Sequence, residues 1–269
     1  MSSTPRIIAV LIDTWLVTSL ACTLVTQDPS HPALDIQHGG IVRADTTKKE
    51  IVLVFTGHEF ADGGEIILGT LSKHRIKAAF FFTGDFYRNR QFSHLITSLK
   101  EAGYYLGAHS DKHLLYCSWE KRDSLLVIHG EFKSDLLSNY LEMARFGITK
   151  EAARYFMPPF EWYDDSISAW TKDLGLVLIN YTSGTYSNAD WTHPELGNQY
   201  LSSDTIFARI LRYEAHHPHG LNGFILLTHI GTDPRRTDKF YRQLDRLITE
   251  LKQRGYQFTR LQEAIPLTR

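Results

Sequence analysis

The residues best suited to chemistry are histidines and carboxylates that follow short apolar runs. The chain of 269 residues contains 13 histidines, and His109 and His113 are spaced by four. On a helical turn, two imidazoles at that spacing face the same side and can bind one divalent ion. His58, Glu59 and Asp62 follow an earlier apolar run. Two imidazoles and one carboxylate leave coordination positions open, which is typical of a catalytic rather than a structural metal site.

The elements that must bring these residues together alternate between strands and helices. Runs rich in β-branched and aromatic residues are separated by segments with helical periodicity. We expect strands at 51–55, 76–83, 104–108, 154–157, 176–181 and 223–228, and helices at 65–74, 91–102, 121–145, 165–173, 205–216 and 236–254. This alternation predicts an α/β fold with a parallel sheet, closed into a barrel. Because sites in such folds collect at the carboxyl ends of the strands, Glu161 and His229 are expected to join the groups named above.

Composition and charge exclude several classes of protein. Hydrophobic residues make up 43% of the chain and charged residues 22%, which excludes a disordered chain and a polytopic membrane protein. Lys and Arg total 29 against 30 for Asp and Glu, so no positive field favours a nucleic acid. Two cysteines, Cys22 and Cys117, are too few for a disulfide scaffold. A polar small molecule or a glycan is the expected partner.

The amino terminus is distinct from the rest of the chain. Ile7–Val25 is mostly apolar, with small residues around Cys22, as in a secretory signal or a lipid-attachment segment. Asp13 argues against a membrane-spanning helix, and the alternative is a segment that packs on the domain. We expect residues 1–41 to form an apolar segment and linker, and 42–269 to form the barrel domain. The protein would then be secreted or held at the cell envelope, with membrane contact only through this segment, and cytoplasmic if the segment belongs to the fold.

The chain resembles the polysaccharide deacetylases of carbohydrate esterase family 4. The likeness runs from about Glu50 to Ala264 and is strongest in IKAAFFFTG (76–84), EAGYYLGAHSDKH (101–113) and residues 223–261. It implies a distorted, incomplete (β/α) barrel. It also implies a metal-dependent hydrolase that removes acetyl groups from a polysaccharide or amino-sugar glycan. The cofactor would be a divalent metal ion, zinc in the first place, and the partner an acetylated carbohydrate.

Several positions match motifs of this family. The spaced histidine pair matches its two metal-binding histidines. Leu227 and His229 match its Leu-x-His motif, in which the leucine lines the pocket for the acetyl methyl group and the histidine is the general acid. Asp190 and Trp191 resemble its fourth motif, whose Trp packs beside the active site.

The first motif of the family departs from its usual form here. It normally reads Thr-Phe-Asp-Asp-Gly, with the first Asp as general base and the second as metal ligand, but residues 54–59 read VFTGHE. The resemblance places His58 and Glu59 near the Asp pair and Asp62 about a turn further on. It favours Glu59 or Asp62 as the metal ligand, and His58 or the remaining carboxylate as the base. As an alternative, Asp62 caps the helix that follows it.

The third motif departs as well. It normally reads Arg-x-Pro followed by Tyr-Gly, whereas residues 157–161 read MPPFE, so the orienting Arg is missing and Glu161 is a polar residue at the substrate site. Trp162, Tyr163 and Trp191 either close the barrel or stack on sugar rings. The missing Asp pair and Arg leave two alternatives to glycan deacetylation. One is a carbohydrate-binding pseudoenzyme on the same barrel, and the other is a hydrolase of a non-sugar amide.

Overall fold

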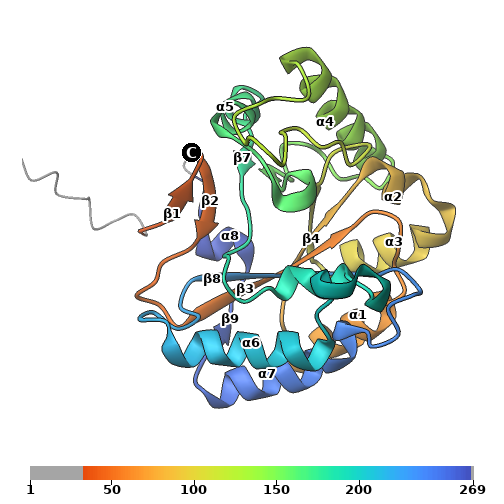
Figure 1. Cartoon of the computed structure of the whole chain (residues 1–269). Coiled ribbons are helices and arrows are strands. Elements are labelled where there is room, and N and C mark those ends of the chain that lie inside the picture. Colours follow the sequence, from red (N-terminus) through yellow and green to blue (C-terminus); the bar gives the residue numbers. More distant parts are fainter. Residues whose placement is uncertain (1–32, 268–269) are drawn as a thin grey trace, which may run out of the picture. The chain divides into compact units, whose positions relative to one another are not determined.

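A curled mixed sheet forms the centre of the domain (Figure 1). The computed structural model describes residues 33–267, and the sheet contains nine strands within them. They are β1 (Asp35–Gln37), β2 (Gly40–Arg43), β3 (Glu50–Gly57), β4 (Ala79–Phe82), β5 (Tyr105–Ala108), β6 (Tyr155–Phe156), β7 (Val177–Leu178), β8 (Phe224–His229) and β9 (Gln257–Phe258). The strand order is β1-β2-β8-β3-β4-β5-β6-β7, and β9 pairs with β3.

The six central strands are parallel, as their sequence pattern predicts. β3 is buried along nearly its whole length, which suits a strand covered on both faces. Its register with its neighbours places Thr56 beside His229 of β8 and beside Phe81 of β4. The carboxyl ends of these strands therefore lie together at one edge of the sheet.

The two edges of the sheet approach each other, which makes the fold an incomplete barrel. β2 is antiparallel to β8 at one edge, and β7 is the strand at the other edge. Ile41 of β2 nevertheless forms a parallel bridge with Ile179, just after β7. The expected α/β half-barrel is thus confirmed, with the correction that the sheet is mixed because β1 and β2 run antiparallel to their partners.

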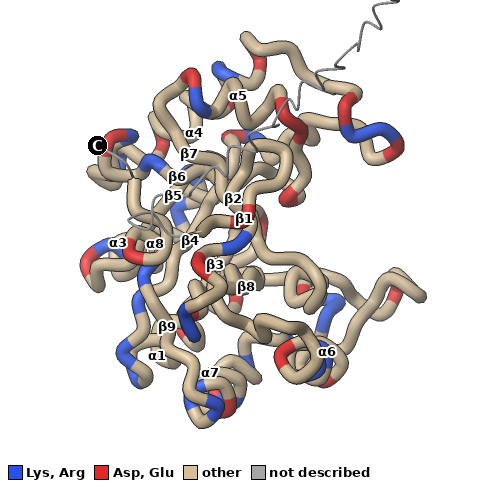
Figure 2. The backbone as a smooth tube through the Cα atoms, turned by 90° about the vertical axis from the view of Figure 1, so that its left-hand side faces the viewer, with Lys and Arg blue, Asp and Glu red and all other residues tan. Residues whose placement is uncertain are grey.

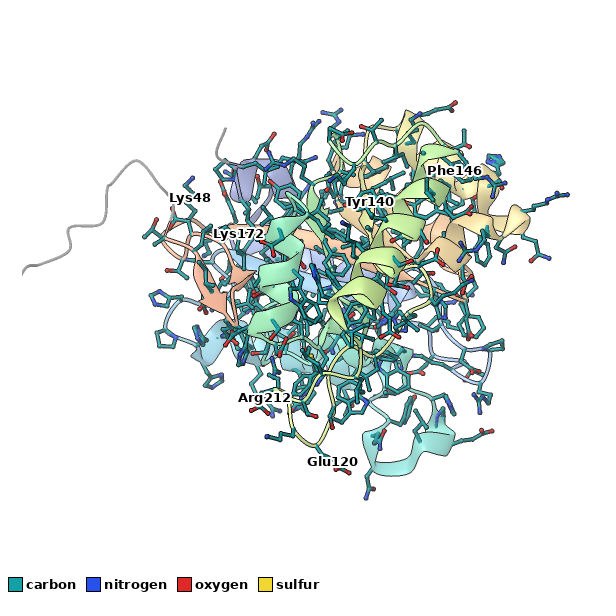
Figure 3. All side chains as sticks on the ribbon, turned by 90° about the horizontal axis from the view of Figure 1, so that it is seen from above. Lys48, Glu120, Tyr140, Phe146, Lys172 and Arg212 are labelled. Atoms are coloured by element: carbon teal, nitrogen blue, oxygen red, sulfur yellow. The ribbon has the colours of Figure 1, made fainter. Side chains whose placement is uncertain are left out.

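Helices cover the outside of the sheet. The longer ones are α1 (Gly64–His74), α3 (Ser93–Glu101), α4 (His129–Ala144), α5 (Asp165–Asp173), α6 (Ser203–His216) and α7 (Leu244–Gln253). The short α2 (Gly84–Arg88) and α8 (Leu261–Ala264) complete the set in the described part. Helices α4 and α5 lie side by side over one part of the sheet (Figures 1 and 3). Helices α6 and α7 lie side by side over another part (Figure 1), where the guanidinium of Arg246 in α7 is 4.2 Å from the ring centroid of Phe207 in α6.

The expected helix at 121–145 begins later than its periodicity predicts. Residues before it form a loop closed by a β-bridge between Cys117 and Leu125, and α4 starts only at His129. The Glu131 carboxylate accepts a hydrogen bond from the backbone N–H of Ile128 at 2.9 Å, which helps to fix that start. This loop carries Trp119 toward the carboxyl edge of the sheet.

Residues that precede the expected boundary at Val42 take part in the sheet, because β1 begins at Asp35 and β2 at Gly40. Tyr163 donates a hydrogen bond to the carbonyl of Gln37 at 2.8 Å, and Thr182 donates one to the carbonyl of Val42 at 2.6 Å. The proposed signal or anchor in Ile7–Val25 lies outside the described residues. Within residues 33–267, no helix is both long and apolar enough to cross a membrane.

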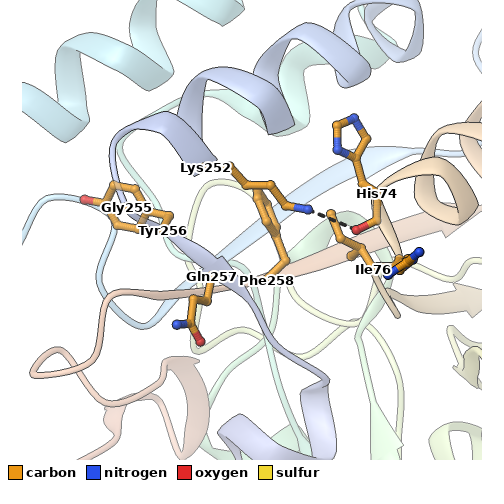
Figure 4. A pocket seen from close by; sticks show the side chains of 8 residues that line it. His74, Ile76, Lys252, Gly255, Tyr256, Gln257 and Phe258 are labelled. Carbon is orange, nitrogen blue, oxygen red and sulfur yellow. Dashed lines mark hydrogen bonds between the residues drawn. The ribbon is translucent and has the colours of Figure 1, made fainter.

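Away from the carboxyl edge, the surface of residues 33–267 has smaller hollows, two of them of about 380 and 500 Å³. Acidic and basic residues alternate along the surface, in agreement with the net charge of −1 (Figure 2). A shallow hollow lies near β9, at the opposite, amino end of β3, and is lined by residues that include His74, Lys252 and Tyr256 (Figure 4). There Lys252 donates a hydrogen bond to the carbonyl of His74 at 3.0 Å.

Candidate active site

A cleft of about 1030 Å³ opens at the carboxyl ends of the strands. Five histidines and two glutamates from separate parts of the chain line it; they are His58, His109, His113, His193, His229, Glu59 and Glu161. The structure therefore brings together the groups that the sequence places after four different strands. Position relative to the sheet, rather than closeness in sequence, explains why they meet.

His109 and His113 are brought together by a loop, not by the helical turn that their spacing suggests. Ser110 and His113 both have positive φ, at 72° and 56°. Asn139 of α4 holds the loop by accepting a hydrogen bond from the N–H of His109 at 2.8 Å. The two ring centroids lie 5.1 Å apart. Non-glycine residues in this region of φ are strained and cluster at functional sites.

Both rings are held in the neutral form. Burial lowers the pKa of His109 to about 3, although the hydrogen bond from its Nδ1–H to the carbonyl of Met157, at 2.8 Å, acts in the other direction. Burial also lowers the pKa of His113 to about 2, and the neighbouring His109 and His58 lower it further. Neutral imidazole is the form that binds a metal ion.

His58 lies beside this pair. Its ring stacks on that of His113, with centroids 4.8 Å apart and planes inclined by 11°. Its Nδ1 is 3.1 Å from Oγ1 of Thr83, the residue that follows β4. Nε2 of His58 lies 4.0 Å from Oε1 of Glu59, at the rim of the cleft.

The family's first motif can also be aligned with this chain through Phe55. Aligned through this phenylalanine, the pattern Thr-Phe-Asp-Asp-Gly places Thr56 and Gly57 at the Asp pair, two residues before the assignment to His58 and Glu59. Thr56 lines the cleft, and its Oγ1 is buried without a hydrogen-bond partner in the described chain.

In this alignment Gly57 stands where the family has a carboxylate ligand, but the space around Gly57 does not suit a carboxylate side chain. A Cβ built there would meet Ile230 at 2.8 Å and the rings of Phe82 and Phe86 at 2.9 Å. A side chain at position 57 would thus point into apolar packing on this backbone. His58, the next residue, reaches the cleft instead.

Of the two acidic residues expected as metal ligands, Glu59 reaches only His58, at 4.0 Å, and Asp62 lies away from the histidines. Glu59 lies at the rim of the cleft with 67% of its side chain exposed. Asp62 is engaged elsewhere: it accepts hydrogen bonds from the N–H of Thr232 at 2.8 Å and the hydroxyl of Tyr241 at 2.9 Å, and pairs with Lys239 at 2.9 Å. Partial burial raises the pKa of Asp62, but these three partners lower it by more, so the carboxylate is a fixed anion. Nor does Asp62 cap α1, which has no side-chain cap.

His229 forms a pair with Asp190. Its Nδ1 lies 2.6 Å from one carboxylate oxygen of Asp190, and its backbone N–H donates to the other at 2.9 Å. Burial lowers the pKa of His229, but the charge and hydrogen bond of Asp190 outweigh it and the net shift is upward. Glu161 adds to this rise, whereas Arg236 opposes it.

Glu161 occupies the place where the family pattern has glycine. It and Phe160 both have positive φ, at 54° and 57°, and Asn180 donates a hydrogen bond to the carbonyl of Glu161 at 2.8 Å. Burial raises the pKa of its carboxyl group to about 7; His229 lowers it and Asp190 raises it. Met157, at the position of the missing Arg, contributes only its backbone carbonyl, which holds His109.

Aromatic rings line one wall of the cleft. Trp119 packs on Trp162 with centroids 5.4 Å apart and is 57% exposed. Trp191 is 47% exposed, while Tyr163 is buried and hydrogen-bonded. Leu227 is fully buried in β8 and is not among the lining residues, so its role in an acetyl pocket stays a prediction.

The side chains do not assemble the metal site that the family pattern implies. Among residues 33–267, no three His, Cys, Asp or Glu side chains converge in a geometry that could hold a metal ion. A third ligand is missing, because position 57 has no side chain, Glu59 is mostly exposed at the rim of the cleft, and Asp62 pairs with Lys239.

Comparison with known proteins defines the class. The sequence model of polysaccharide deacetylases matches residues 43–179. The chain belongs to the polysaccharide deacetylase family. An uncharacterized 30.6 kDa protein of Geobacillus stearothermophilus is 25% identical over 230 residues, which is 85% of this chain and 76% of that protein.

Solved structures share the fold. Bacillus subtilis PdaA, a family 4 carbohydrate esterase, has a TM-score of 0.65 at 23% identity over 84% of this chain and 85% of its own. A chitin deacetylase from Colletotrichum lindemuthianum gives 0.63 at 16% identity, covering 87% and 94%. A family 4 pseudoenzyme from Bacillus anthracis gives 0.65 at 22% identity, covering 86% and 70%.

Proposed function

We propose that this protein hydrolyses acetyl groups of a carbohydrate bound in the cleft. The observation that carries the proposal is the pairing of two groups with raised pKa values, Glu161 and His229, in one aromatic-lined cleft. Groups that titrate near neutral pH serve as general acids and bases with the smallest loss of driving force. Membership of the deacetylase family supports the acetyl group as the target.

Glu161 is the general base in this proposal. Within residues 33–267, the base of the family pattern is absent because Thr56 stands at its position. A carboxyl group with a pKa of about 7 is substantially ionised at neutral pH and can take the proton of a water molecule. The oxygen of that water forms the new bond to the acetyl carbonyl carbon.

His229 is the general acid. Asp190 binds its Nδ1–H and thereby leaves Nε2 to face the cleft and give a proton to the leaving group. When the bond between the carbonyl carbon and the sugar nitrogen or oxygen breaks, the leaving amine or alkoxide receives that proton. One water molecule is consumed, and acetate and the deacetylated sugar are formed.

The aromatic wall binds the sugar. Exposed rings such as Trp119 and Trp191 offer flat apolar faces at the mouth of the cleft, against which a pyranose ring can lie. Metal dependence is a general property of the family; a bound divalent ion polarises the carbonyl and lowers the pKa of water. In this chain the residues available to bind such an ion differ from the family pattern, since Gly57 stands at the position of the carboxylate ligand.

A second candidate is a carbohydrate-binding protein without turnover. Thr56, Gly57 and Met157 replace the base, the metal ligand and the orienting Arg of the family pattern, which favours this alternative. One structural relative is itself described as a pseudoenzyme.

Acetate release decides between the two candidates. The purified full chain is incubated with N-acetylated and O-acetylated oligosaccharides, with Glu161→Gln as the matched variant and calorimetric binding measured in parallel. We expect acetate from the wild type and little from the variant, with sugar binding retained in both. Sugar binding without acetate from any substrate would select the second candidate, and acetate from a simple acetylated amide but from no sugar would select the non-sugar hydrolase.

A further inference from the structure

We propose that His193 binds a hydroxyl group of the sugar and so helps to select which sugar enters the cleft. The His193 side chain lines the cleft, and none of the family motifs described above includes it. This inference rests on the proposed function only for the presence of a sugar in the cleft. It makes no use of the acetyl chemistry, so it can be tested by binding alone.

The first argument is that the His193 ring is buried but makes no hydrogen bond. Only 6% of its side chain is exposed, and neither ring nitrogen has a hydrogen-bond partner among residues 33–267. Buried polar groups in proteins are nearly always hydrogen-bonded, so an unpaired one calls for an explanation such as a bound group. A histidine that served only the packing of the fold would have its nitrogens bonded to neighbouring residues.

The second argument is that the surroundings of the ring orient it toward a ligand. Nδ1 of His193 is buried and lies 4.0 Å from Oε2 of Glu195, which is too far for a hydrogen bond. Arg235 binds the same carboxylate oxygen at 3.1 Å. The negative charge of Glu195 favours the ring proton on Nδ1. Nε2 is then the nitrogen that accepts a hydrogen bond from a hydroxyl group in the cleft.

The third argument is that the backbone fixes His193 together with Trp191. Thr192, which lies between them, is buried, and its carbonyl accepts a hydrogen bond from the fully buried Arg236 at 2.6 Å. Oγ1 of Thr192 donates to the carbonyl of Ala189 at 2.7 Å. Because these bonds already order the segment in the free protein, binding costs little further entropy.

The groups around His193 suit a neutral sugar better than an anionic ligand. Trp191 is 47% exposed and offers an apolar face on which the C–H groups of a pyranose ring can lie. The ring nitrogen of His193 offers a partner for a hydroxyl group at the edge of such a ring. Asp233 and Glu195 carry two negative charges against the one positive charge of Arg235, which disfavours an anion here.

Sugar binding by the full chain tests the proposal. The probes are triacetylchitotriose, an acetylated xylotriose, and versions of each that lack one hydroxyl group, and binding is measured by calorimetry. His193→Ala should weaken binding of the tighter parent sugar by about 10- to 100-fold, as expected when a buried hydrogen-bonding group loses its partner. KM should rise in the same proportion while kcat stays within about twofold, because the bond is present in both the bound substrate and the transition state.

Two further variants separate the ring nitrogen from the volume of the ring. His193→Phe keeps a ring of similar size without a nitrogen, and should bind as weakly as His193→Ala. His193→Gln, whose amide can reach the position of Nε2, should recover most of the affinity. His94→Ala is the control, since it removes an exposed histidine of α3 that is bonded to Ser98, and should bind every sugar like the wild type. Circular dichroism confirms that each variant is folded.

The deoxy sugars identify the contact. One of them should bind the wild type more weakly than its parent sugar does, and should bind His193→Phe with no further loss, because both changes remove the same hydrogen bond. The proposal is overturned if His193→Ala and His193→Phe bind like the wild type, or if every deoxy sugar loses affinity equally in wild type and variant.

The outcomes also separate this proposal from the proposed function. Acetate release that does not depend on His193 would overturn only the assignment of His193. The expected coupling to one hydroxyl group, without acetate release from any sugar, would overturn only the proposed hydrolysis. If no sugar binds and no acetate is released, both proposals are overturned.

Discussion

Asp190 holds His229 at two points, although the residues are 39 positions apart in the chain. One carboxylate oxygen lies 2.6 Å from the ring Nδ1 and the other accepts the backbone N–H at 2.9 Å. The imidazole is thus fixed both in orientation and in the position of its proton. Asp190 and Trp191 both resemble the family's fourth motif, and it is Asp190 that contacts His229.

Asp190→Asn tests what the negative charge of Asp190 contributes, because asparagine has nearly the same size and shape. The amide keeps a hydrogen-bond acceptor but removes the negative charge that raises the pKa of His229. We expect turnover to fall by about 100-fold or more, the usual contribution of a positioned proton donor. The alkaline limb of the pH–rate profile should move to lower pH. Asp204→Asn, which alters an exposed carboxylate on α6 bonded to Gln243, is the control and should leave both unchanged.

The pH dependence of hydrolysis should be bell-shaped. Activity should rise as Glu161 loses its proton, with a pKa of about 7, and fall at higher pH as His229 loses its own. Asp190 raises the pKa of His229 and Arg236 lowers it. The charge of Glu161 interacts with Asp190 and with Tyr181. Glu161→Gln should reduce the rate by about 100- to 10,000-fold and abolish the acid limb of the residual activity. An unchanged acid limb in this variant would assign the base to another group.

Glu161→Gln should also make the protein more stable above neutral pH. The pKa of Glu161 is about 7 in the folded state and 4.5 when unperturbed, so the folded protein binds more protons between these values and loses stability as pH rises through them. The variant does not lose stability in this way, because the glutamine side chain does not titrate. At pH 8 its unfolding free energy should exceed that of the wild type by up to about 3 kcal/mol, and at pH 4.5 the two should be nearly equal. Denaturant unfolding at both pH values measures the difference; equal stabilities at pH 8 would contradict the burial of this charge.

Asp62→Asn should weaken the fold and leave the chemistry intact. The carboxylate contacts Lys239, Tyr241 and the backbone of Thr232 rather than the histidines. Because Asp62 is partly exposed, we expect a loss of about 1 kcal/mol at pH 7. Its pKa is lowered, so this stabilisation is present above pH 3.8 and disappears as pH falls through the folded value. Turnover per folded molecule should not change. If the variant lost a metal ion that the wild type binds, Asp62 would have to be assigned as a metal ligand after all.

Truncation tests which of the N-terminal residues the folded domain needs for its stability. A chain that begins at Ala33 keeps β1 and β2 and should unfold at nearly the temperature of the full chain. A chain that begins at Val42 loses Gln37, which accepts the hydrogen bond of Tyr163, and Ile41, whose carbonyl accepts the N–H of Asn180. Its unfolding temperature should drop by several degrees. Equal melting of the two truncated chains would show that β1 and β2 contribute little.

The sequence by itself determined the alternation of strands and helices. Buried parallel strands are short, continuous apolar runs, and Ile51–Phe55 predicts β3 because that pattern is local. The residues just after each strand can also be placed from the sequence, because the carboxyl ends of parallel strands lie at one edge of the sheet. For this reason the sequence alone is enough to assign His109, His113 and His229 to one cleft.

Only the tertiary structure decided which carboxylates serve the site. Asp62 and Glu161 are both acidic residues after strands, but one is bound by Lys239 from a distant loop and the other lies in the cleft near His229. Such partners come from segments far apart in the chain, and no local pattern encodes them. The direction of a side chain at Gly57, toward Phe82 and Phe86, likewise depends on the packing of neighbouring elements. That packing is the physical reason why His58, and not the acidic residue beside it, stands next to His113.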